Sequence, residues 1–175
     1  KRSGRRAARA QAGIRGRVGL TGAGKCGSMS RTQARLTTGL QILGIADLDV
    51  GRIRAACKQT GWPEAQIAAP SLDDAVRSGA TFVGDDAEAL IRHPAVEVVI
   101  DATGNPHVGI RHCLAAIDHG THVVMVNVAA HVAAGPLPAR TAQKAGVVYS
   151  PAWGAPPALI YHPDVWSRGT GFPVV

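Results

Sequence analysis

Three glycines spaced as G-x-G-x-x-G are the feature of this 175-residue chain that points most directly to chemistry. They follow a β-rich run, expected as a strand over residues 17–21, and precede a helix expected over residues 27–40. In that context the first glycine makes a tight turn, the second lets the backbone approach a phosphate, and the third lets helix and strand pack closely. Backbone N–H groups at a helix N-terminus bind anions. The sequence therefore predicts a diphosphate-binding loop formed by Gly22, Ala23, Gly24, Lys25, Cys26 and Gly27. The competing interpretation is a glycine-rich turn without a ligand.

An acidic residue at the end of the next strand completes the pattern of a dinucleotide site. The apolar run at residues 42–46 predicts that strand, and Asp47 follows it. A carboxylate here is expected to accept hydrogen bonds from the ribose hydroxyls of the adenosine half and to repel a 2′-phosphate, which favours NAD over NADP. Arg52 is close enough in sequence to bind a 2′-phosphate, so NADP stays open. Asp49 competes with Asp47 for the role, and either acid suits a turn or a helix cap instead.

Polar residues also follow two strongly apolar segments further along the chain. Residues 96–103 read VEVVIDAT, the most strand-like segment, and residues 122–127 form another expected strand. Ligands of open parallel sheets bind beyond the carboxyl ends of the strands. The residues at these two ends are therefore expected near the nicotinamide and its ribose or near a substrate: Thr103, Gly104, Asn105 and Asn127.

The rest of the chain alternates β-rich and helical patterns, which is typical of a parallel sheet covered by helices. Three polar residues suit helix N-caps: Ser71, Asp85 and, with a proline after it, Asn105. Further strands are expected over 80–83 and 147–150, and further helices over 50–60, 71–78, 86–92, 106–119 and 135–145. The predicted fold is α/β, a doubly wound parallel sheet of the Rossmann type.

The composition suits one domain with an aliphatic core, because 46% of the residues are hydrophobic and 4% are aromatic. No uninterrupted apolar run of about 18 residues occurs, so a membrane-spanning helix is not expected. Residues 151–175 hold five prolines and no sustained periodicity, which argues against long regular elements there. We expect a dinucleotide-binding domain over 17–150, preceded by a basic leader over 1–16 and followed by a proline-rich tail over 151–175, a remnant or the start of a missing catalytic domain.

The net positive charge of the chain comes from its leader. The chain has 19 basic and 12 acidic residues, and seven of the basic residues lie in the first 17 positions without any acid. The remainder is neutral, which argues against a nucleic-acid-binding body. We expect the leader to be a disordered, solvated tail; a weak contact with a polyanion and part of a transit-like segment are the alternatives.

Three cysteines, Cys26, Cys57 and Cys113, form neither a disulfide framework nor a zinc-binding pattern. Cys113 lies among apolar positions of an expected helix, where a buried small hydrophobic residue is favoured over a nucleophile. We expect a reduced, cytoplasmic protein without a metal site. His131, shortly after the predicted site residue Asn127, is interpreted as a surface residue.

On these residues the chain resembles the NAD(P)-binding domain of the homoserine dehydrogenase-like oxidoreductases, from about Val18 to Tyr149. The closer resemblance is to the subfamily that carries a C-terminal SAF domain, some members of which are 1-deoxy-D-xylulose 5-phosphate reductoisomerase-like enzymes. The matching segments include VGLTGAGKCGSM, GIADLD, VEVVIDATGNP and HVVMVNV. The resemblance implies hydride transfer, with Gly22, Gly24, Gly27 and Asp47 on the dinucleotide and Thr103, Gly104, Asn105 and Asn127 near the nicotinamide.

The chain departs from this family at three places. After MVNV the family usually has Glu-Ala-Asp, where this chain has Ala129, Ala130 and His131. Where the family usually has Gly-Asp-Gln/Glu-Pro, residues 154–157 read GAPP. The family's catalytic domain, with its lysine, lies beyond residue 175. We therefore expect cofactor binding, whereas turnover is expected to need the positioning that the missing domain supplies.

Three functions stay open on the sequence. The preferred one is an NAD(P)-dependent oxidoreductase, represented by its cofactor domain, that transfers a hydride to or from a small carbonyl or hydroxy substrate; its catalytic residues are unassigned. The second is a non-catalytic dinucleotide-binding module, a truncated or decayed relative. The third is a polyanion-binding protein that works through its leader, although nucleic acid is not an expected partner. The expected partners are the dinucleotide and a small-molecule substrate, and a homo-oligomer stays open.

Overall fold

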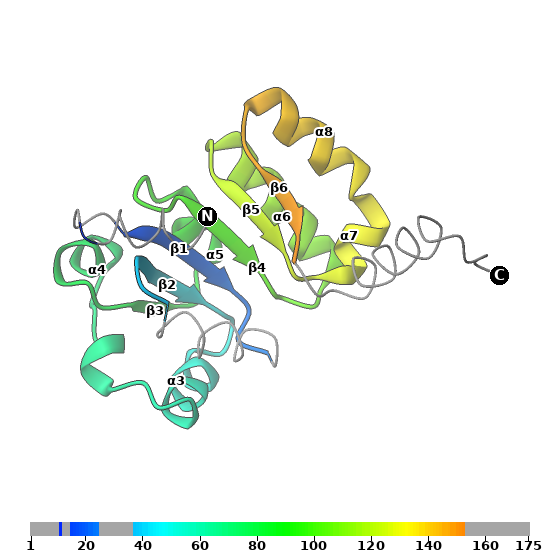
Figure 1. Ribbon diagram of the computed structural model, residues 1–175. Helices are drawn as coiled ribbons and strands as arrows, with labels where there is room; N and C mark the ends of the chain where they lie inside the picture. The colour runs from blue at the N-terminus through cyan, green and yellow to red at the C-terminus, as the bar shows by residue number, and fades with distance from the viewer. Residues whose placement is uncertain (1–10, 12–14, 25–36, 153–175) are drawn as a thin grey trace, which may run out of the picture.

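The structure is a computed structural model, and it describes residue 11, residues 15–24 and residues 37–152 (Figure 1). Three predictions fall outside these ranges: most of the basic leader, the loop residues Lys25, Cys26 and Gly27 with the helix expected after them, and the tail from residue 153. Within the described part, residues 37–39 form a turn and Leu40 begins a strand. The predicted end of that helix at residue 40 is therefore wrong.

Six parallel strands form one sheet in the order β3-β2-β1-β4-β5-β6. From β1 the chain adds strands outward on one side and then returns to the other side of β1, so the direction of winding reverses between β1 and β4. This is the doubly wound Rossmann order, and it confirms the predicted fold class. The strands are β1 (Gly16–Thr21), β2 (Leu40–Ala46), β3 (Phe82–Gly84), β4 (Val98–Asp101), β5 (His122–Met125) and β6 (Tyr149–Pro151).

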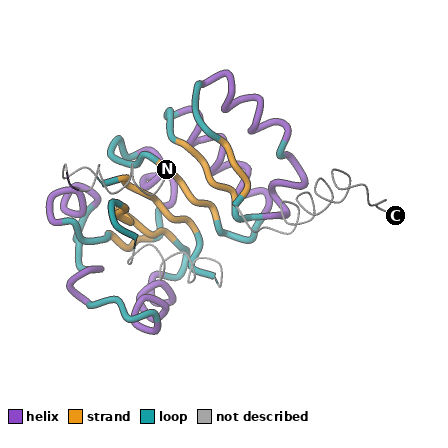
Figure 2. Tube along the Cα trace, viewed as in Figure 1, coloured by secondary structure: helices purple, strands orange, loops and turns teal. Residues whose placement is uncertain are grey.

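From β2 onward, helices connect the strands and pack around the sheet, as Figure 2 shows with the helices in purple and the strands in orange. Because the strands are parallel, the carboxyl ends of all of them lie at the same edge of the sheet. The helices of the described part are α3 (Val50–Gln59), α4 (Leu72–Ser78), α5 (Ala87–Arg92), α6 (Pro106–Asp118), α7 (Val128–Ala134) and α8 (Pro136–Ala145), with a 3₁₀ turn, η1 (Glu64–Ile67), before α4.

Side-chain caps fix where several of these helices begin. Ser71 caps α4 and Asn105 caps α6, with Pro106 in the first helical position, and both predictions are confirmed. At α5 the cap is Asp86, so the prediction of Asp85 is wrong. The physical reason is that β3 ends one residue later than predicted, which shifts the turn into α5 by one position.

The chain after β5 differs most from its prediction. The strand expected over residues 122–127 ends at Met125, and Asn127 caps α7, a helix that the sequence interpretation missed. The sequence of α7 is VAAHVAA, which is apolar almost all round and shows no polar face to mark it as a helix. The strand expected over residues 96–103 is likewise shorter, because β4 spans Val98–Asp101 and the following loop begins at Ala102.

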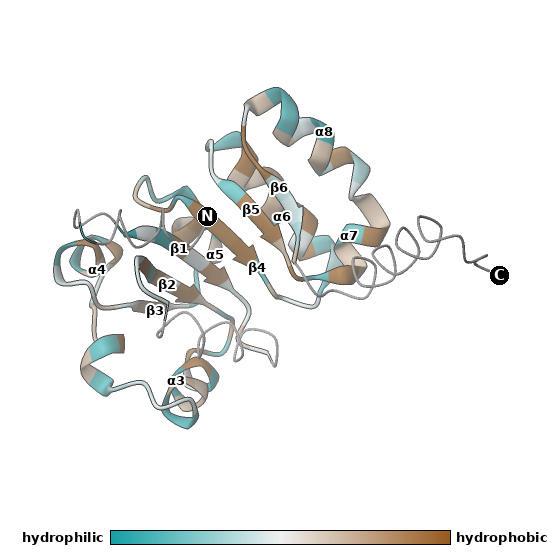
Figure 3. Cartoon of the chain, in the orientation of Figure 1, coloured by the Kyte–Doolittle hydropathy of each residue, from teal (hydrophilic) through white to brown (hydrophobic). Residues whose placement is uncertain are grey.

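Two hydrophobic clusters flank the sheet. Successive residues of a strand point to opposite faces, so Val99 of β4 belongs to the cluster under α4 to α8, whereas Ile100 packs against the cluster under α3 and η1. Leu43 and Ile42, which are successive residues of β2, divide in the same way. Figure 3 shows the resulting apolar colour along β2, β4 and β5. Burial on both faces explains why the central strands read as nearly continuous apolar runs.

The first prediction concerns this core. Leu43 has no exposed surface, so Leu43→Ala removes buried methyl groups and leaves a cavity. We expect the free energy of unfolding to fall by about 2–5 kcal/mol, measured by urea denaturation. Leu48→Ala is the matched control, because Leu48 is 95% exposed, and it should change the same quantity by less than about 0.5 kcal/mol. Equal losses in the two variants would contradict the placement of Leu43 in the core.

Candidate functional site

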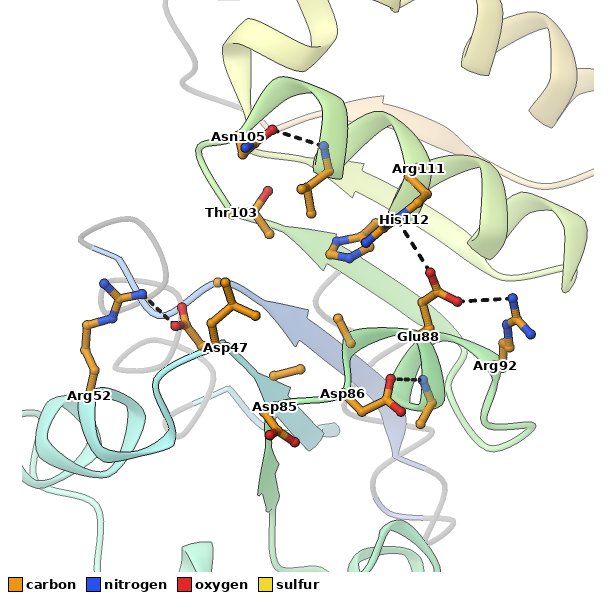
Figure 4. Close-up of a pocket in the computed structure, with 16 residues that line it drawn as sticks. Asp47, Arg52, Asp85, Asp86, Glu88, Arg92, Thr103, Asn105, Arg111 and His112 are labelled. Atoms are coloured by element: carbon orange, nitrogen blue, oxygen red, sulfur yellow. Dashed lines mark hydrogen bonds and ion pairs between the residues drawn. The ribbon is translucent and has the colours of Figure 1, made fainter.

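A pocket of about 920 Å³ opens at the carboxyl ends of β1, β2 and β4, where the strand order reverses (Figure 4). In doubly wound sheets this switch point is where ligands bind. Four connections line it, those that follow β1, β2, β3 and β4. The lining residues are Gly22, then Ala46, Asp47, Leu48 and Arg52, then Asp85, Asp86, Ala87, Glu88, Ala89 and Arg92, and finally Thr103, Asn105, Val108, Arg111 and His112.

At two positions of the loop after β1, Gly22 and Gly24, a side chain would meet different surroundings. Gly22 has a φ of +93°, and a Cβ on it would lie 2.5 Å from the carbonyl oxygen of Ala102. No side chain fits there, because the ends of β1 and β4 approach each other too closely. A Cβ on Gly24 would meet none of the described residues within 4 Å. Packing against the described part of the chain therefore does not require a glycine at this position.

Asp47 joins this loop to the connection after β2. Its Oδ2 accepts a hydrogen bond from the N–H of Ala23 at 2.6 Å, and its Oδ1 accepts from the N–H of Asp49 at 3.0 Å and from Nη2 of Arg52 at 2.6 Å. Asp49 caps α3 by accepting from the N–H of Arg52. The structure thus separates the two candidate acids, since Asp47 lines the pocket and Asp49 holds the helix.

These contacts set the charge of Asp47. Burial acts to raise the pKa of its carboxyl, but the N–H groups of Asp49 and Ala23 and the guanidinium of Arg52 outweigh it and hold the pKa below the ordinary value of 3.8. The group is therefore a charged carboxylate at neutral pH and acts only as a hydrogen-bond acceptor. A ligand hydroxyl meets a suitable partner there, whereas a phosphate meets a negative charge that Arg52 offsets.

Asn127 holds the loop that follows β4. Its Nδ2 donates to the carbonyl oxygen of Asn105 at 2.9 Å and to Oγ1 of Thr103 at 3.3 Å, and its Oδ1 accepts from the N–H of Ala130 at 3.1 Å. Gly104 makes the turn of this loop with a φ of +73°. Of the four residues predicted here, Thr103 and Asn105 line the pocket, whereas Asn127 is buried and supports the loop from behind.

A buried polar cluster lies beneath this loop, and the sequence interpretation missed it. The carboxylate of Asp101 has no exposed surface. Its Oδ2 accepts from Oγ1 of Thr21 at 2.9 Å and lies 3.0 Å from Nδ1 of His112, while its Oδ1 accepts from Oγ1 of Thr103 at 3.0 Å. An acid inside the apolar run VEVVIDAT was the available signal, because a buried carboxylate needs partners. The spacing gave no sign of which partners, since Thr21 is 80 positions away.

Ion pairs cover the wall opposite Asp47, where Figure 4 shows Glu88 between two arginines. Glu88 Oε2 lies 3.2 Å from Nη2 of Arg92, and Oε1 lies 3.5 Å from Nε of Arg111. The pair with Arg111 links α5 to α6. Exposed pairs of this kind contribute about 0–1 kcal/mol, so a bound ligand can compete for either arginine at little cost.

His131 is not the surface residue that the sequence interpretation expects. It is partly buried, its Nδ1 lies 2.8 Å from the hydroxyl of Tyr149, and the two rings stack with centroids 5.9 Å apart. Burial, with the nearby Cys113, raises the pKa of Tyr149 to about 12, so the hydroxyl keeps its proton at neutral pH. Cys113 has no exposed surface, as predicted, and burial together with the charge of Asp101 raises its pKa to about 12. Its thiol is therefore unsuited to nucleophilic attack.

Two further searches covered the residues that the structure describes. No helix among them is long and apolar enough to span a bilayer. Nor do any three His, Cys, Asp or Glu side chains in these ranges gather as a metal ion requires.

In a comparison with known protein families, residues 18–149 match the family described as homoserine dehydrogenase, NAD binding domain. No curated protein matches the chain. The match does not distinguish subfamilies, so the closer resemblance to the SAF-domain-containing, reductoisomerase-like subfamily stays a prediction.

Solved structures of three enzymes resemble this one. A probable dehydrogenase from Thermotoga maritima has a TM-score of 0.63 at 15% identity, covering 89% of this chain and 41% of that one. A homoserine dehydrogenase from Thiobacillus denitrificans has a TM-score of 0.59 at 20% identity, covering 77% and 28%. Biliverdin reductase from Synechocystis sp. PCC 6803, in complex with biliverdin and NADP⁺, has a TM-score of 0.59 at 20% identity, covering 78% and 37%. At these identities the likeness shows a shared fold, and this chain spans less than half the length of each.

Proposed function

The chain belongs to the family of homoserine dehydrogenase NAD-binding domains, and from this premise we propose that it is the cofactor-binding domain of an NAD(P)-dependent oxidoreductase. The proposed reaction is hydride transfer to or from a small carbonyl or hydroxy substrate. The proposal assigns residues 17–150 to the cofactor domain and leaves 1–16 and 151–175 outside it. A cytoplasmic location is part of the proposal, supported by three cysteines whose spacing forms no disulfide framework.

The observation that carries the proposal is the position of Gly24 beside the carboxylate of Asp47. A Cβ on Gly24 would meet no atom of the described residues within 4 Å, and Gly24 follows directly on Ala23, whose N–H is bonded to Asp47. A dinucleotide needs these two features next to each other, bare backbone for its diphosphate and an acceptor for its adenosine ribose. Lys25, Cys26 and Gly27 complete the proposed diphosphate loop, although they lie outside the described residues.

The two halves of the dinucleotide then extend from this loop in opposite directions. We assign the adenosine half to the side of Asp47 and Leu48, and Leu48 offers an exposed apolar surface to a base. We assign the nicotinamide half to the side of β4, where Thr103 and Asn105 present polar groups. Asn127 acts on this half indirectly, by fixing the loop that carries both residues.

The nicotinamide, when bound, donates or accepts the hydride. The residues of this chain bind and orient it: the glycine loop holds the diphosphate, Asp47 holds a ribose, and the loop after β4 sets the position of the ring. Hydride transfer needs the reacting atoms about 3–3.5 Å apart, so rigid support of that loop by Asn127 and Asp101 favours the reaction.

A pair of glycine variants tests the diphosphate loop. Gly24→Val should abolish dinucleotide binding in equilibrium dialysis while leaving the circular dichroism spectrum unchanged, because a Cβ there meets no atom of the described residues but occupies the proposed place of a phosphate. Gly22→Ala should lose stability as well, by about 1–3 kcal/mol, because it forces a left-handed backbone and a Cβ against Ala102. If Gly24→Val binds NAD as the wild type does, the placement of the diphosphate is refuted.

The preference for NAD depends on Asp47. In calorimetric titrations with NAD, NADH, NADP and NADPH, we expect the wild type to bind the NAD forms more tightly, because the carboxylate repels a 2′-phosphate. Asp47→Asn should narrow that difference, and Arg52→Gln should weaken NADP more than NAD. Arg54→Gln, on the exposed side of α3 and outside the pocket, is the control and should change neither affinity. If Asp47→Asn prefers NAD over NADP as strongly as the wild type does, the carboxylate of Asp47 does not set that preference.

A non-catalytic dinucleotide-binding module is the second candidate function. One observation favours it: His131, where the resembling family usually has an acid, is engaged with Tyr149. The two candidates differ in turnover, followed as oxidation of NADH or NADPH by absorbance at increasing concentrations of small carbonyl substrates. The oxidoreductase proposal expects oxidation that depends on both substrate and protein and that is lost in Gly24→Val. Tight binding without oxidation for any carbonyl tested would favour the module.

A further inference from the structure

His112 is a pocket residue that the proposed function leaves without a role. It is 3% exposed, yet it lines the pocket from α6, and Figure 4 shows its ring turned toward the cavity. Its Nδ1 lies 3.0 Å from Oδ2 of Asp101. Its Nε2 has no hydrogen-bond partner within the part of the chain that the structure describes. The imidazole thus has one anchored nitrogen and one that is open toward the pocket.

Asp101 decides which of the two nitrogens carries the hydrogen. Its carboxylate is fully buried, and the hydroxyls of Thr21 and Thr103 already donate to it. A carboxylate accepts hydrogen bonds and does not donate them. The hydrogen of the neutral imidazole therefore lies on Nδ1, directed at Asp101, and Nε2 presents a lone pair.

The approach of α6 to β4 makes this anchor possible. Gly109 lies one turn before His112, and a Cβ on it would come within 2.9 Å of Oδ1 of Asp101 and 2.7 Å of Nδ2 of Asn127. Because Gly109 has no side chain, the helix comes close enough for His112 to reach the carboxylate. The ring is therefore held in one orientation, so the direction of the Nε2 lone pair is set before any ligand arrives.

We propose that Nε2 of His112 accepts a hydrogen bond from an N–H or O–H group of the bound dinucleotide. The inference rests on the proposed function, which puts the dinucleotide in this pocket. Three kinds of group have a suitable hydrogen: the adenine amino group, the ribose hydroxyls and the nicotinamide carboxamide. The diphosphate has none at neutral pH, so its binding stays with the glycine loop.

The test separates the two nitrogens of the ring. In His112→Asn the amide nitrogen takes the place of Nδ1, since both are bonded to Cγ, so the bond to Asp101 is kept and the acceptor at Nε2 is lost. We expect NAD to bind about 2- to 10-fold more weakly by calorimetry, the effect of one neutral hydrogen bond, with the melting temperature nearly unchanged. His112→Gln places an amide oxygen near the position of Nε2 and should bind NAD more tightly than His112→Asn. His107→Asn is the control, because His107 lies on the same helix, exposed and outside the pocket.

ADP as a second ligand identifies the donor. A loss in His112→Asn that is equal for ADP and NAD supports a donor in the adenosine half, and a loss for NAD alone supports one in the nicotinamide half. Nicotinamide hypoxanthine dinucleotide, which carries an oxygen in place of the adenine amino group, then distinguishes that amino group from a hydroxyl.

Two outcomes overturn the inference while leaving the proposed function intact. One is unchanged affinity for NAD in His112→Asn. The other is weaker binding accompanied by a fall in melting temperature of more than about 5 °C, which assigns His112 to the stability of the fold. Failure of the wild type to bind either NAD or NADP is a different result, because it refutes the proposed function and the role of His112 with it.

Discussion

A carboxylate without exposed surface lies at the point where the sheet reverses its winding, and the arrangement of the site depends on it. Asp101 is the last residue of β4. Its carboxylate accepts hydrogen bonds from the hydroxyls of Thr21, at the end of β1, and of Thr103, in the following loop, and it contacts the ring of His112 on α6. A buried charge without partners costs several kcal/mol, so the folded domain must bring all of these donors together. The ends of two strands, one loop and one helix are thereby held in a single arrangement, and the pocket is the space above it.

The glycines show how the same residue type serves packing at some positions and a ligand at another. At Gly22 and Gly109, a side chain would collide with the backbone of Ala102 or with the polar groups of Asp101 and Asn127. These two glycines let parts of the protein approach each other. Gly24 has no such neighbour among the described residues, so packing against them does not explain the missing side chain there. The proposed diphosphate would explain it, and this difference is why the proposed site depends on Gly24 more than on Gly22.

Local signals in the sequence predicted the fold well where a side chain acts on its own backbone. Ser71 and Asn105 cap their helices as expected, because a cap needs only the N–H groups two or three residues ahead. The prediction was wrong where neighbouring elements set a boundary. Asp86 caps α5 in place of Asp85 because β3 extends one residue further, and α7 was missed because its residues, apolar almost all round, carry no periodic pattern.

For the site, the sequence by itself determined the parts that are close along the chain: the glycine loop, the acid after the next strand, and the polar loop after the most apolar strand. Their spacing follows from the strand–turn–helix geometry of one α/β unit, so it can be read from a single sequence. Only the tertiary structure decided that Asp49 caps a helix while Asp47 faces the pocket, that Asn127 supports the loop from behind, and that Asp101 holds His112. The pairs Asp47–Ala23 and Asn127–Asn105 join different crossovers of the sheet, and the pair Asp101–His112 joins a strand to the helix packed against it. Their contact depends on how the helices pack, and no periodicity along the chain records it.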